Sequence, residues 1–268
     1  MDKTYWCGLG VRRALGFLLL ALAAGLLAGL SSSAQAPQGV PMARQAPVPR
    51  DAAGHPDISG YWELRYDSRS VPPANLTQDA ISREPAQRQH DVLAMRFCAL
   101  VGMPEVMEDG ATLDIRQGPK VIGMLAKSPS SVRYIYTDGR SHPAKDEIDQ
   151  VTNGNSIGHW EGDALMVDTI GFSDRGITLI PGGGFRTPDS HLVERFHLLN
   201  GGAILSVTST WEDAKVFTTP HTYEFRYYKV PQIGLPLQYG CSANDQDRAN
   251  FIMSAMKSSE STSTQVSH

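Results

Sequence analysis

Apolar and polar residues alternate along much of this chain, and that pattern restricts its fold more than any other feature. Trp62, Leu64 and Tyr66, for example, alternate with Glu63 and Arg65. The single segments that alternate in this way are 62–66, 132–136 and 222–230. The segments 156–169 and 191–211 each contain two alternating parts. A repeat of two residues is the signature of a β-strand with one buried face. The chain is therefore predicted to be mainly β.

Turn residues separate these segments. Glu161-Gly162-Asp163 interrupts 156–169, and Asn200-Gly201-Gly202 interrupts 191–211, as expected for two hairpins. Short strands without intervening helices favour an antiparallel meander. We expect this meander to close into a single barrel over residues 57–253, although a two-sheet sandwich fits the same pattern.

One segment has helical rather than strand character. Thr77 is a suitable N-cap, and the helical pattern runs toward Ala94. Pro85 lies inside it, and a proline in a helix interior favours a break at that point. We therefore expect one short helical segment in an otherwise β domain.

The first 34 residues have the organisation of a secretory signal peptide. Arg12 and Arg13 precede an apolar run over 14–30, and small residues follow the run. We expect cleavage after Ala34, and hence a periplasmic or secreted protein that is not stably inserted in a membrane once its leader is gone. An uncleaved anchor is the alternative, since the run approaches the ~20 residues that span a bilayer.

Two segments of biased composition flank the predicted domain. Residues 35–56 are rich in Ala, Pro and Gln, and are expected to form a tether that is disordered or loosely laid on the domain. Residues 254–268, rich in Ser and Thr, are expected to be a disordered tail. The two cysteines outside the leader are Cys98 and Cys241. In an oxidising compartment they are expected to pair, with two free thiols as the alternative.

Charge and motifs exclude several classes of function. The formal net charge is −4 at pH 7, and no basic cluster marks a nucleic-acid surface, so no nucleic-acid partner is expected. The sequence contains no G-x-S-x-G, no phosphate-binding glycine loop and no H-E-x-x-H zinc helix. We therefore expect neither a cofactor nor a metal. The sequence leaves the oligomeric state open.

Ionisable residues that interrupt apolar strands are the candidates for catalysis. On the strand that begins at 191, the alternation places Glu194 on the apolar face and Arg195 on the opposite one. A carboxylate on a buried face needs a partner, or its pKa rises. An ion pair between Glu194 and an arginine is the structural alternative. The candidate catalytic residues are His142, Asp168, His191, Glu194 and Arg195.

Aromatic residues of the same strands are candidates for a binding wall. If they face one concave space, they form a cup for a hydrophobic or aromatic small molecule. These candidate substrate-binding residues are Trp62, Tyr134, Tyr136, Trp160, Phe196 and Trp211.

Two strings of the sequence, 138–143 and 155–172, resemble a large and mostly uncharacterised family of secreted bacterial β-proteins. Residues 57–62, and His191 with Glu194-Arg195-Phe196, agree with that resemblance, as does a cysteine near each end of the domain. The resemblance implies a calycin-like or lipocalin-like barrel with a cup for a small molecule. It implies no particular reaction.

The resemblance also bears on individual residues. His142, Asp168, His191 and Glu194 stand where the pattern of that family places them. The chain departs from the pattern at Ala164, where relatives usually carry threonine. It departs again at His159, where arginine is frequent.

Two hypotheses for the function follow. The first is an exported enzyme that performs metal-free acid–base chemistry, as an isomerase, cyclase, lyase or hydrolase, inside the barrel. His142 or His191 would move the proton, a carboxylate would orient the imidazole, and Arg195 would stabilise a developing anion. The second is a ligand carrier without catalysis. Both require that polar and aromatic side chains of separate strands meet in one concave space.

Overall fold

The computed structural model describes residues 46–96, 101–108, 112–126 and 131–231. The expected signal peptide, the tail 254–268, and both Cys98 and Cys241 lie outside these residues.

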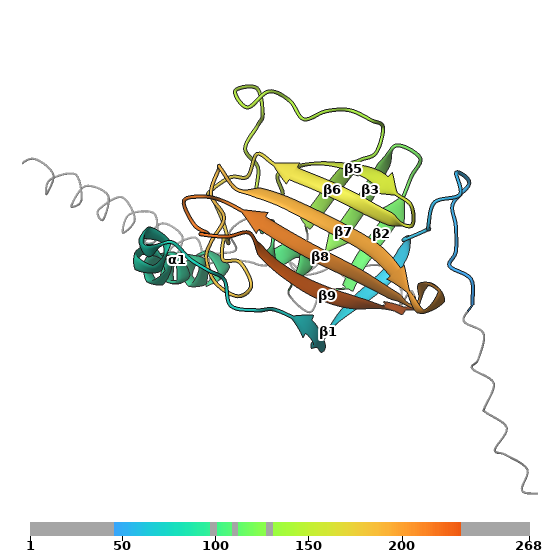
Figure 1. Cartoon of the computed structure of the whole chain (residues 1–268), viewed down its shortest axis with the longest axis horizontal. Coiled ribbons are helices and arrows are strands. Elements are labelled where there is room, and N and C mark those ends of the chain that lie inside the picture. The colour runs from blue at the N-terminus through green and yellow to red at the C-terminus, as the bar shows by residue number, and fades with distance from the viewer. Residues whose placement is uncertain (1–45, 97–100, 109–111, 127–130, 232–268) are drawn as a thin grey trace, which may run out of the picture. The chain divides into compact units, whose positions relative to one another are not determined.

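The described residues form nine strands and one α-helix. The strands close into a barrel in which each lies beside its neighbours in sequence and the last pairs with the first, as Figure 1 shows. In chain order the elements are β1 (Gly60–Ser70), α1 (Gln78–Arg96), β2 (Thr112–Gln117), β3 (Val121–Ala126), β4 (Ser131–Tyr136), β5 (Asn155–Glu161), β6 (Ala164–Ile170), β7 (His191–Leu199), β8 (Ile204–Glu212) and β9 (His221–Val230). Single 3₁₀ turns occur at Glu105–Met107 and Asn200–Gly202. The prediction of a mainly β, calycin-like barrel is confirmed, and the sandwich is excluded.

One pair of neighbouring strands departs from the antiparallel meander. β4 and β5 run parallel and share only two residue pairs, Ile135 with Ser156 and Tyr136 with Ile157. Parallel neighbours need a connection that returns to the start of the first strand. The long loop 137–154 makes that return.

The interior of the barrel is filled by large side chains. Trp62, Phe196, Trp211 and Tyr227 are all fully buried. Their polar atoms find partners: the Trp62 indole donates to the carbonyl of Ile58 at 2.9 Å, and the Trp211 indole donates to a tyrosine hydroxyl at 3.1 Å. A buried tryptophan keeps its full packing benefit only when its N–H is bonded in this way.

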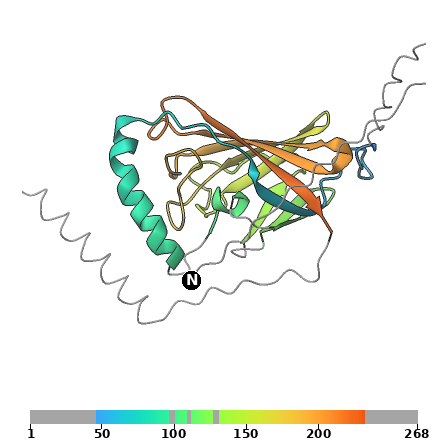
Figure 2. The same cartoon turned by 90° about the horizontal axis from the view of Figure 1, so that it is seen from below.

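The helix α1 lies at one end of the barrel, as Figure 2 shows. The Thr77 hydroxyl accepts the backbone N–H of Ala80 at 3.1 Å, which confirms the predicted N-cap. The helix continues without a break through Pro85 and is 19 residues long, so it is longer than expected. Among the described residues, no helix combines the length and the apolar character needed to cross a membrane.

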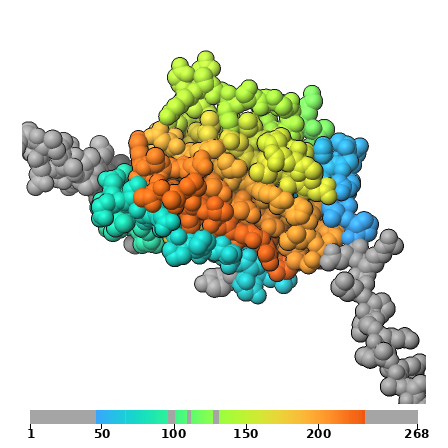
Figure 3. Space-filling model, in the orientation of Figure 1, coloured from blue at the N-terminus to red at the C-terminus, as the bar shows by residue number. Residues whose placement is uncertain are grey.

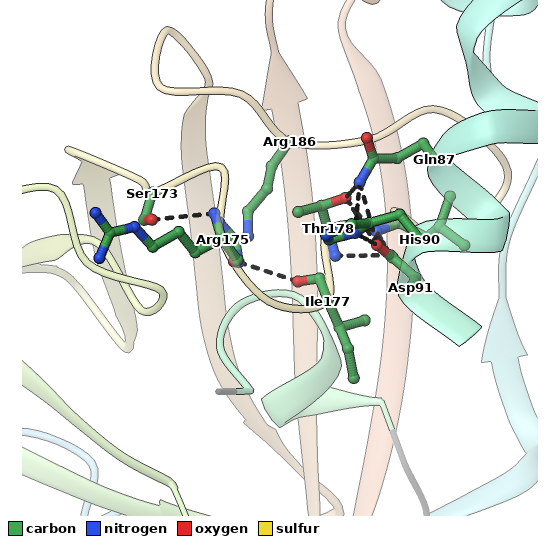
Figure 4. A network of polar contacts seen from close by, with 9 residues as sticks. Gln87, His90, Asp91, Ser173, Arg175, Ile177, Thr178 and Arg186 are labelled. Atoms are coloured by element: carbon green, nitrogen blue, oxygen red, sulfur yellow. Dashed lines mark hydrogen bonds and ion pairs between the residues drawn. The ribbon is translucent and has the colours of Figure 1, made fainter. Parts of the chain in front are cut away.

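A buried polar network fixes α1 to the loop between β6 and β7 (Figure 4). Asp91 of the helix is fully buried and accepts the backbone N–H groups of Thr178 and Leu179, each at 2.7 Å. In the same loop Arg186 donates to three backbone carbonyls, among them that of Ile177. Burial lowers the pKa of Arg186 to about 10.

The described N-terminal segment lies at the opposite end of the barrel from α1. Figures 1 and 3 show it in blue beside the β5–β6 turn. Arg50 forms two hydrogen bonds to the carboxylate of Asp163 in that turn, at 2.9 and 3.0 Å. Residues 46–56, which composition assigned to the tether, are therefore laid on the barrel.

Candidate functional site

Three of the predicted catalytic residues meet in one cluster. Asp168 on β6 contacts two imidazoles: its Oδ1 lies 2.8 Å from Nε2 of His142, and its Oδ2 lies 2.9 Å from Nε2 of His191. The cluster extends to both sides, because Nδ1 of His142 lies 2.8 Å from the Asn155 side-chain oxygen and Nδ1 of His191 lies 3.1 Å from Glu212. Side chains from a loop and four strands thus form one continuous chain of polar contacts.

This imidazole–carboxylate cluster lies on the outer wall of the barrel. Asp168 lies between Val167 and Thr169, both of which are buried, and its own side chain is 40% exposed. Neighbouring residues on a strand point to opposite faces. The cluster therefore does not line the interior, where the sequence placed the chemistry.

The cluster favours the protonated form of His191 and the ionised form of Asp168. Burial opposes protonation of His191, but hydrogen bonds to Asp168 and Glu212 outweigh it, so its pKa is raised above 6.5. Burial likewise opposes ionisation of Asp168, but the hydrogen bonds from His191 and His142 lower its pKa below 3.8. All four ring nitrogens of the two histidines face a protein partner. A substrate must displace one of these partners to receive a proton.

The cluster makes stability depend on pH in a defined direction. Because the pKa of His191 is raised, its contribution is complete below about pH 6.5 and is lost as the pH rises through the raised value. Because the pKa of Asp168 is lowered, its contribution is complete above about pH 4 and is lost as the pH falls through the lowered value. Both contributions are complete only between these limits.

We therefore expect Asp168→Asn to lower the melting temperature most between about pH 4 and 6.5, and less above pH 8. Thermal unfolding followed by circular dichroism across this range measures the difference from the wild type. Arg195→Gln, a charge change on the same outer face, is the control and should show no such window. A deficit of Asp168→Asn that grows above pH 8 contradicts this assignment.

Glu194 is separated from the histidines and points into the barrel. It is fully buried and pairs with both terminal nitrogens of the Arg133 guanidinium, one of them at 3.0 Å. Arg133 also donates to Ser156 at 3.1 Å and to Thr169 at 2.9 Å. The structural alternative for Glu194, an ion pair with an arginine, is the one found. Arg195, its neighbour on β7, is exposed on the outer face.

The six aromatic candidates do not line one cup. Trp62, Phe196 and Trp211 are packed in the interior. Tyr134 is 56% exposed on the outer wall, and Tyr136 lies beneath the Arg140 guanidinium at 3.9 Å. On β4 the inward residues are Arg133 and Ile135, so the tyrosines face outward. Trp160 is only partly buried and packs against the interior cluster from one end of the barrel.

Trp160 belongs to a pocket at the barrel end where the N-terminal segment lies; we call it the mouth pocket. Its volume is about 560 Å³. One wall is a stacked pair, in which the rings of His55 and Trp160 are 5.0 Å apart and within 3° of parallel. Its wall includes Asp51, His55, Gln117, Pro119, Ile122 and Trp160.

Hydrogen bonds fix the polar side of the mouth pocket. Asp51 accepts the backbone N–H groups of Ala53 and His55 at 2.9 Å, and the side-chain amide of Gln117 at 2.8 Å. Gln117 in turn accepts the N–H of Ile58 at 3.0 Å. Burial disfavours the ionised form of Asp51, but these hydrogen bonds outweigh it and lower its pKa.

Sequence reasoning missed several residues of these sites. Asp51 and His55 lie in a segment whose composition suggested disorder, and only the presence of charged residues among its prolines distinguished it. Arg133 could have been found, because Glu194 on an apolar face requires a cationic partner. No group of three or more His, Cys, Asp or Glu side chains within the described residues is arranged to hold a metal ion.

Scans against protein-family models and against curated proteins find no match to this chain.

Proposed function

We propose that this protein is an exported ligand-binding barrel that holds a small planar molecule in the mouth pocket. The observation that carries the proposal is the His55–Trp160 pair, two parallel stacked rings that belong to the wall of a pocket of about 560 Å³. Sites for small molecules typically have about 300–1,000 Å³ and mainly apolar walls with a few fixed polar groups. The mouth pocket meets both conditions. Export is supported by the leader pattern of the first 34 residues.

The bonding of the other polar groups favours the mouth pocket as the ligand site over the barrel interior and the outer wall. Arg133 and Glu194 in the interior are fully buried and bonded to each other. On the outer wall, the ring nitrogens of His142 and His191 already have partners. At the mouth, by contrast, aromatic faces and a carboxylate line an open volume.

The test is the binding of 2-naphthol, a neutral planar probe, by isothermal titration calorimetry. We expect saturable binding, and a loss of about tenfold in affinity in Trp160→Leu, because stacking and contact area are removed. Tyr134→Leu removes an exposed aromatic from the outer wall and should leave the affinity unchanged.

His55→Leu, a change outside the barrel strands, gives an independent check if Trp160→Leu folds poorly. The proposal fails if the wild type shows no saturable binding, or if both mouth variants bind as the wild type does.

Acid–base catalysis is the second candidate, and one observation favours it: His142, Asp168 and His191 do meet. For this function the substrate has to lie against the outer wall and replace a partner of a ring nitrogen. Recovery of the bound ligand unchanged after long incubation supports the carrier. Conversion that His191→Ala abolishes and Trp160→Leu leaves intact supports the enzyme.

A further inference from the structure

We infer that the mouth pocket selects planar ligands that carry a cationic or N–H-donating group, and discriminates against carboxylates. This inference rests on the proposed function and adds the chemical class of the ligand. It follows from the position and the bonding of Asp51, whose carboxylate is part of the pocket wall.

Asp51 has an acceptor position to spare. A carboxylate offers about four positions for hydrogen-bond donors. Its Oδ1 receives two backbone N–H groups, from Ala53 and His55, whereas its Oδ2 receives one donor, the Gln117 amide, among the described residues. A ligand N–H can therefore bind at Oδ2 without displacing a protein group.

The carboxylate is also held in place and ionised. Its backbone partners belong to the turn that it caps, so the side chain is fixed before a ligand arrives. The same hydrogen bonds lower the pKa of Asp51, which keeps it negative at neutral pH. A fixed charge loses less conformational freedom on binding than a mobile one does.

No lysine or arginine belongs to the described wall of the pocket. The nearby Arg50 is occupied by the Asp163 carboxylate through two hydrogen bonds. Lys120 follows the wall residue Pro119 but is exposed and is not part of the wall. An anionic ligand would thus face Asp51 without a compensating cation, whereas a cation would gain both the carboxylate and the Trp160 ring.

The experiment compares three naphthalenes that differ in one group: 2-naphthylmethylamine, 2-naphthalenemethanol and 2-naphthoate. Calorimetric titrations at pH 7 and low salt should give affinities in the order amine, alcohol, carboxylate, with at least tenfold between the amine and the carboxylate. In Asp51→Asn, which keeps an oxygen for the backbone N–H groups, this ratio should fall to about threefold or less. Asp146→Asn, an equal change of charge at an exposed loop position, should leave the ratio unchanged.

The outcomes separate the two claims. If none of the three compounds binds to the wild type, the proposed function fails. If all bind but the carboxylate binds as tightly as the amine, or if Asp51→Asn keeps the tenfold ratio, the function stands and the selectivity is wrong. Should Asp51→Asn not fold, raising the salt concentration with the wild type must shrink the preference for the amine; a preference unchanged by salt overturns the inference.

Discussion

Glu194→Leu is expected to lower the free energy of unfolding by about 3–5 kcal/mol, measured by urea denaturation. The substitution leaves the guanidinium of Arg133 inside the barrel without its carboxylate, and that side chain is only 1% exposed. Hydrogen bonds to Ser156 and Thr169 remain, but neither neutralises the charge. The cost comes from a buried charge that has lost its counter-ion.

The double variant Arg133→Met/Glu194→Leu is the control for this explanation. It removes both charges and restores an apolar interior, so it should be more stable than Glu194→Leu alone. The loss of stability in the double variant is compared with the losses in Glu194→Leu and in Arg133→Met. If it equals the sum of these two losses, the two side chains act independently and the ion pair is not the cause.

Asp91→Ala is expected to destabilise the protein by about 2–4 kcal/mol, because two backbone N–H groups, one of a buried and one of a half-buried residue, lose a charged acceptor. Those groups belong to Thr178 and Leu179, and Figure 4 shows Asp91 beside Thr178. The change should also detach α1 from the β6–β7 loop. Hydrogen exchange at the Thr178 and Leu179 amides, read by mass spectrometry or NMR, should accelerate more than exchange in β7 and β8.

The matched control lies on the same helix. Asp79→Ala removes an exposed carboxylate from the first turn of α1, where its partner Arg83 is also exposed. Such surface pairs contribute little, so this variant should lose less than about 1 kcal/mol. Equal losses for Asp79→Ala and Asp91→Ala would show that helix propensity, and not the buried contact, sets the effect.

Alternation along single strands could be read from the sequence with good accuracy. The pattern of β7 placed Glu194, Phe196 and Leu198 on the buried face, and the structure agrees. Alternation alone does not say which face is inside, however. On β4 the apolar Val132 and the tyrosines suggested one inner face, but the structure turns Arg133 inward because its partner Glu194 lies there.

Contacts between distant segments were harder to predict. The sequence named His142, Asp168 and His191 together, but it could not show that they meet on the outer wall, because that depends on the path of the loop 137–154. The strands β2 and β3 were not identified, although β2 does alternate: Leu113 and Ile115 are buried between more exposed neighbours. The Asp51 turn was missed because its composition is that of a linker.

The barrel is closed most weakly between β4 and β5, which share only two residue pairs. The strands β7 and β8, by comparison, share nine residue pairs. We therefore expect local opening between β4 and β5 to cost less free energy than separation of β7 from β8. The loop 137–154, which connects β4 to β5, carries His142, and the imidazole of His142 contacts Asp168 on β6. This contact ties the connecting loop to β6 on the outer wall, while Arg133 of β4 bonds Ser156 of β5 in the interior, so we expect the two contacts together to oppose opening between β4 and β5.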